Sequence, residues 1–390
     1  MPHLPFIGFS FLLGLAGYAA HKGQARSEKS LVEGAQAPAL PAAPEQVESL
    51  LHLDRLELEV GYGLIPIVDE EQSGDLLDRI RSIRRQFASE LGMVIPPLRV
   101  RDNLQLKPGE YRLLIKGNEV AKGEMMPGYI MALNPGEVKR TVEGIPTKEP
   151  VFQLPALWVA EKRKEEAQFA GYTVVDISTI IATHLTEIIR SHADELLGRQ
   201  DVQRLLDRLA EQYPKVVEEL TPHLLSLGAV QKVLQNLLKE RVSIRDLLTI
   251  LETLADYATM TKDPDLLTEY VRQRLARTIL KQFETQEGLL PLITMDQKME
   301  DFLRDRIQKG EYGINLALEP SLVHKILTSF QQALDRITSL NAQPVILCSP
   351  VLRRHLKRLL ERFLPQVAVL SHSELTPQAK IQSIGVVTWT

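Results

Sequence analysis

The histidines and serines that could take part in catalysis lack the spacing and the neighbouring residues of known catalytic motifs. His184 and His192 are eight residues apart with Glu187 between them, whereas the helical zinc-protease motif places its histidines at i and i+4. Ser178 and Ser349 lack the flanking glycines of a nucleophile elbow, so we expect both to cap helices. These residues support neither a metalloprotease nor a serine hydrolase.

Glycine and cysteine positions give the same indication. Gly61-Tyr62-Gly63 lacks the third glycine of a dinucleotide-binding loop and opens a predicted strand, so we expect a turn or bulge between strands. No Gly-Lys-Ser or Gly-Lys-Thr occurs anywhere in the sequence. Cys348 is the only cysteine, which excludes an internal disulfide and a multi-cysteine zinc site, and we expect it to be buried. The sequence therefore predicts a protein that is not an enzyme and binds no cofactor or metal.

Charge excludes one class of partner. The 390 residues include 46 Lys and Arg against 50 Asp and Glu, so the net charge of −4 lacks the basic excess of a nucleic-acid-binding protein. Arg79, Arg81, Arg84 and Arg85 gather on one predicted helix and could bind an acidic partner, although a solvated helix face is the favoured interpretation. At this length we expect two to four domains.

The first folded part of the chain has the periodicity of an α/β layer. Residues 56–60 alternate apolar and acidic side chains, the pattern of a half-buried strand. Residues 76–91 carry apolar side chains at helical spacing after a start at Ser73-Gly74-Asp75, and Gly92 follows where a helix-ending glycine belongs. A second strand is expected from Val100. This order of strand, helix and strand predicts an α/β subdomain.

A small lobe is predicted inside this subdomain. The next elements are strand-like runs at 111–115, 129–133, 157–159 and 173–175, and a charged helix at 162–170. The intervening residues 137–155 are rich in glycine and proline and are expected to form loops. A helix capped by Asp176 or Ser178 then continues to Ile189. We assign residues 55–127 and 177–196 to the first α/β subdomain and residues 128–176 to an inserted small α/β subdomain.

The remainder of the chain divides into an all-α part and a second α/β part. Residues 197–276 have helical apolar stripes and almost no strand signal, and Ser243 to Asp246 resembles a capping box at a helix start. Residues 277–390 alternate between predicted strands at 289–293, 343–348, 367–370 and 384–387 and predicted helices at 320–340 and after Ser349-Pro350. This order predicts a mostly parallel sheet. The expected fold class is multidomain, α/β plus α.

The N-terminal residues suggest a membrane anchor. Residues 4–20 are almost entirely apolar and uncharged, which is about the minimum length of a bilayer-spanning helix. Basic residues follow at Lys22, Arg26 and Lys29, and the positive-inside rule then places the downstream chain in the cytoplasm. A secretory signal peptide is the alternative, although no Lys or Arg precedes the apolar run. Residues 22–54 are rich in Ala, Pro and Glu and predict a linker, with a short helix at 45–53.

Five segments give the chain a resemblance to a known family. LEVGYGLIPIVD, RIRSIRRQFASELG and PPLRVRDNLQL resemble the signature of the export-gate (FHIPEP) family of flagellar and type III secretion systems. GIPTKEPVFQLPALWV and TVVDISTIIATHLTE are similar to its flagellar (FlhA-type) branch. The resemblance runs from about Met1 to beyond Lys281 and weakens toward the C-terminus. MPHLPF looks like the start of the family's last membrane helix, so residues 1–21 are expected to be that helix and the chain a C-terminal fragment.

The resemblance implies a transport component. Such a protein has four cytoplasmic subdomains after its last membrane helix, lies in the bacterial inner membrane with the bulk of this chain in the cytoplasm, and forms a nine-membered homo-oligomeric ring. The ring docks complexes of flagellar export chaperones with their substrates for secretion driven by proton-motive force. Other implied partners are the export-gate membrane subunits and the export ATPase complex with its stalk. We expect residues 200–276 to supply much of the contact between subunits.

The resemblance also implies a docking site. The family uses an acid, a phenylalanine three residues later and a threonine in an ATH segment, and here these positions are Glu149, Phe152 and Thr183. Family members carry aspartate at the first position, so Glu149 keeps the charge and adds a methylene. An exposed phenylalanine in a proline-rich loop offers a rigid apolar anchor, and a nearby carboxylate would orient a basic or hydroxyl group of the partner. The residues alone favour the alternative in which Phe152 fills the core and Glu149 is solvated, and the resemblance reverses that preference.

Two other functions stay open. One is the injectisome counterpart of the same family, which differs in cargo. The other is a membrane-anchored enzyme, which would need a polar pocket with strongly shifted titratable groups.

Overall fold

The computed structural model describes residues 53–69, 71, 74–136, 138–310, 313–335 and 343–388. The predicted membrane helix at 1–21, the short helix at 45–53 and nearly all of the linker lie outside the described residues. No helix within the described ranges is long and apolar enough to cross a bilayer. The elements below all belong to the compact unit Arg55–Thr390.

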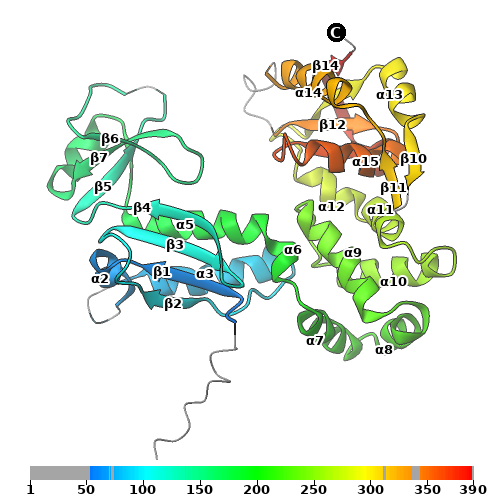
Figure 1. Cartoon of the computed structure of the whole chain (residues 1–390), viewed down its shortest axis with the longest axis horizontal. Helices are drawn as coiled ribbons and strands as arrows, with labels where there is room; N and C mark the ends of the chain where they lie inside the picture. The colour runs from blue at the N-terminus through cyan, green and yellow to red at the C-terminus, as the bar shows by residue number, and fades with distance from the viewer. Residues whose placement is uncertain are drawn as a thin grey trace, which may run out of the picture. The chain divides into compact units, whose positions relative to one another are not determined.

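The first sheet has the strand order β2-β1-β3-β4. Strand β1 (Leu56–Val60) pairs in parallel with β2 (Arg99–Asp102), and the long helix α3 (Leu76–Glu90) lies between them in the sequence, so the predicted strand–helix–strand unit is confirmed. Strands β3 (Glu110–Ile115) and β4 (Asn118–Glu124) form a hairpin whose two loop residues, Lys116 and Gly117, have φ of 50° and 75°. Helices α3 and α5 (Ile177–Ser191) lie along this sheet (Figure 1).

The segment after β1 differs from the prediction. Gly61-Tyr62-Gly63 does not open a strand, because Tyr62–Leu64 forms a 3₁₀ turn that continues into the short helix α2 (Ile65–Val68). The two glycines bring the backbone against the 107–110 loop, where a Cβ on Gly61 would lie 2.0 Å from a carbonyl oxygen. The proline in the first turn of α2 has the backbone angle that a helix start requires. A short apolar run without a clear period is compatible with either element.

The second sheet lies between β4 and α5 in the sequence and has the order β6-β7-β5-β8, with every pair antiparallel. Its elements are β5 (Tyr129–Leu133), β6 (Ile145–Lys148), β7 (Pro155–Ala160), α4 (Lys164–Phe169) and β8 (Thr173–Val175). Strand β6 falls in the stretch predicted to be all loop. It is an edge strand, where a proline that donates no hydrogen bond is tolerated. This sheet and α4 bury a small cluster of their own: Ile130, Ala132, Val142, Val159, Ala167, Ala170 and Tyr172.

Residues 193–281 are all described and contain helices and no strand, as predicted. The helices are α6 (Ala193–Leu196), α7 (Arg199–Ala210), α8 (Pro214–Glu218), α9 (Leu227–Lys239), α10 (Leu247–Ala258), α11 (Pro264–Arg274) and α12 (Ala276–Lys281). The predicted capping box at Ser243 is wrong, because Asp246 caps α10 and accepts a bond from the Thr249 N–H. The Ser243 hydroxyl instead donates to the Glu90 carbonyl at 2.6 Å.

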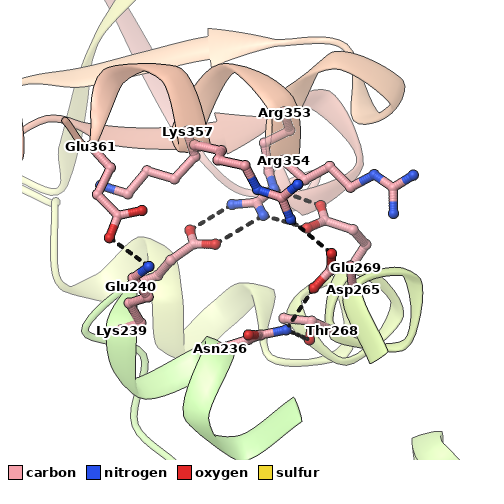
Figure 2. Close-up of a pocket in the computed structure, with 11 residues that line it drawn as sticks. Asn236, Lys239, Glu240, Asp265, Thr268, Glu269, Arg353, Arg354, Lys357 and Glu361 are labelled. Carbon is pink, nitrogen blue, oxygen red and sulfur yellow. Dashed lines mark hydrogen bonds and ion pairs between the residues drawn. The ribbon is translucent and has the colours of Figure 1, made fainter. Parts of the chain in front are cut away.

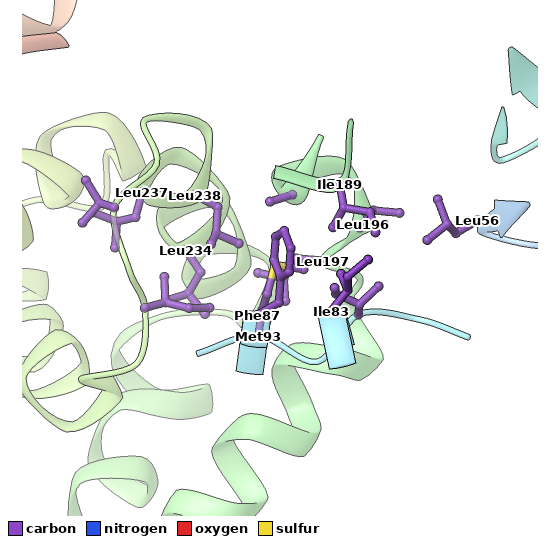
Figure 3. Close-up of a cluster of buried hydrophobic side chains, with 14 of the residues drawn as sticks. Leu56, Ile83, Phe87, Met93, Ile189, Leu196, Leu197, Leu234, Leu237 and Leu238 are labelled. Atoms are coloured by element: carbon purple, nitrogen blue, oxygen red, sulfur yellow. The ribbon is translucent and has the colours of Figure 1, made fainter. Parts of the chain in front are cut away.

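Residues of the helical segment form hydrogen bonds with the C-terminal end of α3. The Ile244 N–H donates to the Leu91 carbonyl at 2.8 Å, and the Arg245 guanidinium donates to the Ser89 carbonyl at 2.9 Å. These bonds supply partners for carbonyls that a helix end leaves unpaired. One hydrophobic cluster also joins the two regions, and Figure 3 shows Phe87 and Met93 among leucines of α9 and the Leu196-Leu197 corner. The first sheet region and the helices therefore share a core.

The last sheet is parallel throughout, as predicted, with the order β13-β12-β9-β14. The strands of this sheet are β9 (Leu289–Met295), β12 (Val345–Cys348), β13 (Ala368–Ser371) and β14 (Lys380–Val387). The helices of the same region are α13 (Gln297–Arg304), α14 (Pro320–Asp335) and α15 (Pro350–Leu360). The hairpin β10 (Ile307–Gly310) and β11 (Gly313–Leu316) and helix α13 were not predicted. In β12, Ile346 and Cys348 pack with helices α13–α15, whereas Val345 and Leu347 join the cluster of the helical segment. Both faces of the sheet are therefore covered, which is typical of parallel sheets.

Candidate docking site

Phe152 lies in the loop between β6 and β7 with 65% of its surface exposed, so it does not fill the core. The loop is held by backbone bonds from the Glu149 N–H to the Leu154 carbonyl (2.9 Å) and from the Gln153 N–H to the Glu149 carbonyl (3.0 Å). Gln153 adopts the left-handed conformation with φ of 58°. The hairpin thus presents the phenylalanine from a tightly closed turn.

Glu149 is only 7% exposed and is neither solvated nor directed at an open surface. One oxygen of its carboxylate accepts the Val151 N–H at 2.8 Å, and the other accepts the Phe152 N–H at 2.7 Å. Bonds of this kind, from a side chain to the backbone two and three residues on, stabilise tight turns. Both carboxylate oxygens of Glu149 therefore accept hydrogen bonds from within the loop that contains Phe152.

Two more apolar side chains lie on the same hairpin. Ile145 at the start of β6 and Leu154 just before β7 are each about half exposed. Neither residue was predicted from the sequence to belong to the site. Their apolar character among prolines and polar residues was the available signal, and it acquires meaning only once β6 is known to be an edge strand. Phe152 is thus one of three exposed apolar residues on this hairpin, with Ile145 and Leu154.

Thr183 is exposed on α5, and its hydroxyl donates to the Thr179 carbonyl at 2.7 Å. Because that bond uses only the hydroxyl proton, the oxygen can still accept a bond from a partner. Thr183 lines an open groove of about 480 Å³ between α3 and α5, with Thr179, Thr186, Ser82 and Gln86 among the other lining residues. Glu149 and Phe152 do not line this groove. The structure therefore brings two of the three predicted residues into one loop and places the third in the α3–α5 groove.

A buried hydrogen bond joins β3 to α5 beside Thr183. The Tyr111 hydroxyl of β3 and Nδ1 of His184 on α5 lie 2.7 Å apart, and both side chains are buried. Burial raises the pKa of the Tyr111 phenol, and the nearby Glu149 carboxylate raises it further. Burial lowers the pKa of His184, and Glu149 opposes that shift. His184 is thus a buried hydrogen-bonded residue next to Thr183.

The predicted arginine cluster on α3 is mostly solvated. Arg79 lies at the groove and pairs with Asp75 at 2.7 Å and Asp176 at 3.5 Å. Arg84 and Arg85 are exposed. These positions fit the favoured interpretation of a charged helix face.

Comparison with known proteins identifies the family. The FHIPEP family model matches residues 1–380, nearly the whole chain. The chain belongs to the FHIPEP family. It is 48% identical over 382 residues to the flagellar biosynthesis protein FlhA of Bacillus subtilis (strain 168), covering 96% of this chain and 56% of that protein. It is 43% identical over 389 residues to FlhA of Escherichia coli (strain K12), covering 99% and 55%. The chain thus spans slightly more than half the length of these relatives.

Two solved structures share the fold. The Chlamydia pneumoniae CdsV protein in complex with CdsO gives a TM-score of 0.77 at 27% identity, covering 86% of this chain and 98% of that one. The nonameric EPEC SctV-C, solved by cryo-electron microscopy, gives 0.70 at 26% identity with the same coverage. The mixed α/β architecture described above is therefore shared with these two solved proteins.

This FHIPEP chain also contains a small pocket of about 100 Å³ lined largely by charged side chains of α9, α11 and α15. Figure 2 shows Arg353 projecting from α15 toward Glu240 and Glu269. Its guanidinium donates to Glu240 at 2.6 and 3.0 Å and to Glu269 at 2.5 Å. Arg272 of α11 binds Glu240 at 3.1 Å and Glu374 at 2.6 Å. Five charged groups from four separate stretches of the sequence meet here.

The titratable groups of this pocket are strongly shifted. Burial raises the pKa of Glu240, but Arg272 and Arg353 outweigh burial and hold it at about 2. Burial raises the pKa of Glu269, and the attraction of Arg353 does not offset that effect. A membrane-anchored enzyme would need a polar pocket whose titratable groups have strongly shifted pKa values. Each charge here, however, is bound by an opposite charge, and a pocket of this size has room for only a few water molecules. The arrangement is that of a structural ion-pair network.

The other candidate reactive groups are structural in the described part of the chain. Asp176 caps α5 and Ser178 lies inside it, which settles the open choice of cap. Ser349 occupies the N-cap position of α15, but its buried hydroxyl has no partner among the described residues. Cys348 is buried, which raises the pKa of its thiol and disfavours the nucleophilic thiolate. Within the described residues, no group of His, Cys, Asp and Glu is arranged to hold a metal ion.

Proposed function

We propose that this chain is the cytoplasmic part of an export-gate subunit of the flagellar type III export apparatus, and that it docks chaperone–substrate complexes through the Phe152 hairpin. The observation that carries this proposal is the exposed phenylalanine on a loop closed by the buried Glu149. Membership of the FHIPEP family and two relatives named flagellar biosynthesis proteins support the assignment to the flagellum.

The hairpin has the physical properties of a protein anchor. Phe152 offers a large apolar ring with few rotatable bonds, and Ile145 and Leu154 add exposed apolar surface on the same hairpin. An aromatic anchor of this kind dominates the energy of many interfaces, because it removes apolar area from water at little entropic cost. Thr183 in the α3–α5 groove supplies a hydroxyl for a polar contact. Glu149 keeps the loop in shape for the partner.

The domain organisation belongs to the same proposal. We divide the chain into a last membrane helix (1–21), a linker (22–54), a first α/β subdomain (55–127 and 177–196), an inserted α/β subdomain (128–176), an all-α subdomain (197–276) and a C-terminal α/β subdomain (277–390). The three four-stranded sheets and the strand-free helical segment support this division. The anchor would place the protein in the bacterial inner membrane with its bulk in the cytoplasm, and proton-motive force would drive secretion.

Two solved structures support the proposed oligomeric assembly and a further protein partner. The nonameric EPEC SctV-C supports a ring of nine subunits, with the all-α subdomain supplying much of the contact. The complex of CdsV with CdsO supports an additional protein partner, which we assign to the stalk of the export ATPase complex. The other membrane subunits of the gate would meet the N-terminal anchor. The subunit binds no nucleic acid and no cofactor, and it carries out no bond-making chemistry.

The injectisome export gate is the second candidate, because the solved CdsV and SctV-C structures share the fold. Their identities of 26–27% are well below the 43–48% of the flagellar relatives, which favours the flagellar assignment.

One experiment separates the two candidates. The chain is titrated in parallel with flagellar chaperone–substrate complexes and with injectisome chaperone–substrate complexes. We expect saturable binding of the flagellar complexes alone. Binding of only the injectisome complexes would overturn the flagellar assignment, and binding of neither would overturn the docking function.

A further inference from the structure

A cavity of about 770 Å³ lies beside the C-terminal ends of α3 and α5, where the helical segment meets the last sheet region. Seven of its described lining side chains are Lys or Arg, against two carboxylates, Glu90 and Glu240. We refer to it as the basic cavity. Neither Phe152 nor Thr183 lines it, so it is separate from the proposed docking site.

Four of the seven cations have carboxylate partners within the protein. The partners lie 2.6–3.5 Å from the cationic nitrogens. The paired cations are Arg190, Lys239, Arg241 and Arg272. The protein itself therefore offsets much of their charge, and they provide little evidence for a ligand.

The other three cations of the basic cavity are Lys357, Arg245 and Lys281, and none has an ion pair with a carboxylate among the described residues. The Lys357 ammonium donates to the Val367 carbonyl at 2.9 Å, and the Arg245 guanidinium donates to the Ser89 carbonyl at 2.9 Å. An ammonium has three N–H donors and a guanidinium five, so both groups keep donors for a further partner. Lys281 is exposed at the end of α12.

Lys357 gives the clearest indication of an anionic ligand. Its side chain is half-buried on α15 (Figure 2), and burial lowers the pKa of its ammonium group. Glu240 and Glu361 oppose that shift without cancelling it. The protein alone thus disfavours the charged form, which an anion in the cavity would stabilise. A concave surface with an excess of one charge also concentrates ions of the opposite charge.

We propose that the basic cavity is a binding site for a small ligand with two or three phosphate groups, held by Lys357, Arg245 and Lys281. Such a ligand carries negative charge to match the three unpaired cations, and both Lys and Arg bind phosphate oxygens well. The cavity volume falls within the range of about 300–1,000 Å³ for small-ligand sites and is much larger than one phosphate requires. Phe283 and Ile279 supply an apolar wall for an uncharged part of the ligand. The site does not depend on the proposed docking function.

The test is calorimetric titration of the full chain with inorganic pyrophosphate and with ADP, at low and at physiological ionic strength. We expect one saturable site for both probes, with weaker binding at the higher ionic strength because salt screens the three cations. Inorganic phosphate should bind about tenfold more weakly than pyrophosphate, since it reaches fewer of these cations. Acetylation of amines by acetic anhydride, followed by mass spectrometry, locates the site, because saturating pyrophosphate should slow the reaction of Lys357 and Lys281.

Two variants test the named cations. Lys357→Met and Lys281→Glu should each weaken pyrophosphate binding by about tenfold, because the first loses a bond to a charged group and the second reverses a charge. Lys281 is exposed, so its variant should keep the wild-type melting curve and tests the site independently of Lys357. Lys262→Met and Lys262→Glu are the matched controls, because Lys262 also donates to a backbone carbonyl but does not line the cavity. Both should bind pyrophosphate as the wild type does.

Four results would overturn the inference. The first is the absence of saturable pyrophosphate binding, or equal weakening by the Lys262 controls. The second is binding of inorganic phosphate as tight as that of pyrophosphate. The third is tighter binding of a short poly-glutamate peptide, which would assign the cavity to an acidic protein segment. The fourth is binding of phosphatidylglycerol vesicles without binding of free pyrophosphate, which would mean a lipid headgroup.

Discussion

Arg353 on α15 donates two hydrogen bonds to Glu240, which follows α9, although 113 residues separate them in the sequence. The side chain of Arg353 is only 1% exposed, so this contact lies in the interior. Glu269 of α11 binds the same guanidinium, and the three groups join the last sheet region to the helical segment. The contact thus adds an ion-pair link between two regions that also share a hydrophobic cluster.

Removal of Arg353 should cost much stability. Arg353→Met leaves Glu240 and Glu269 buried with less compensating charge, and breaking a buried pair from one side costs about 3–5 kcal/mol. The matched control is Arg358→Met on the same helix, because Arg358 is half exposed and pairs with Asp265 at 2.9 Å. That change should cost less than about 1 kcal/mol. Urea denaturation of both variants tests this expectation, and equal costs for the two would contradict it.

The stability that Glu240 contributes should depend on pH. Its pKa in the folded protein is about 2, against an ordinary value of 4.5. A depressed carboxyl pKa stabilises the fold above the unfolded value, and that contribution is lost as the pH falls through the folded value. At 1.36 kcal/mol per pKa unit, Glu240→Gln should be less stable than the wild type by about 3 kcal/mol at neutral pH.

The same argument predicts how that difference changes in acid. Denaturation at pH 7, 5 and 3 should give a similar difference at the first two values and less than about half of it at the third. A difference that stays constant down to pH 3 would mean that Glu240 is not held ionised by Arg353 and Arg272.

Gly92 should tolerate no side chain. It has φ of 76°, and a Cβ there would lie 2.3 Å from Cα of Arg245. Gly92→Ala therefore adds a steric overlap to the left-handed penalty, and we expect a loss of about 3 kcal/mol or more. Gly128→Ala is the control, because Gly128 has φ of 83° and no described atom within 4 Å of its Cβ position. That variant should lose about 1 kcal/mol, and similar losses for both would show that the Arg245 contact is unimportant.

The regular elements were predictable because their signals are local. The alternating residues of β1, the apolar stripe of α3 and the strand–helix order of the last sheet each follow from a short window of sequence. The exceptions depend on distant residues. Tyr62–Val68 forms helical turns where Gly61 and Gly63 meet the 107–110 loop, and Ser243 bonds the end of α3 instead of capping α10.

The site was predictable only in part. The residues alone favoured a buried Phe152, and the family resemblance pointed to Glu149, Phe152 and Thr183 without their geometry. Neither source could show that the Glu149 carboxylate is buried and accepts the Val151 and Phe152 N–H groups, because that geometry depends on how the hairpin folds. The Arg353 network escaped prediction for the same reason, since a charged residue on a helix is normally solvated.

The central claim is that Phe152 anchors the chaperone–substrate complex, and calorimetric titration of Phe152→Ala tests it most directly. We expect a loss of about 2 kcal/mol in binding free energy, close to a 30-fold weaker affinity, with an unchanged melting curve. Phe169→Ala is the matched control, because Phe169 is 78% exposed at the end of α4 in the same sheet region, and its affinity should match the wild type. Wild-type affinity in a correctly folded Phe152→Ala variant would contradict the account.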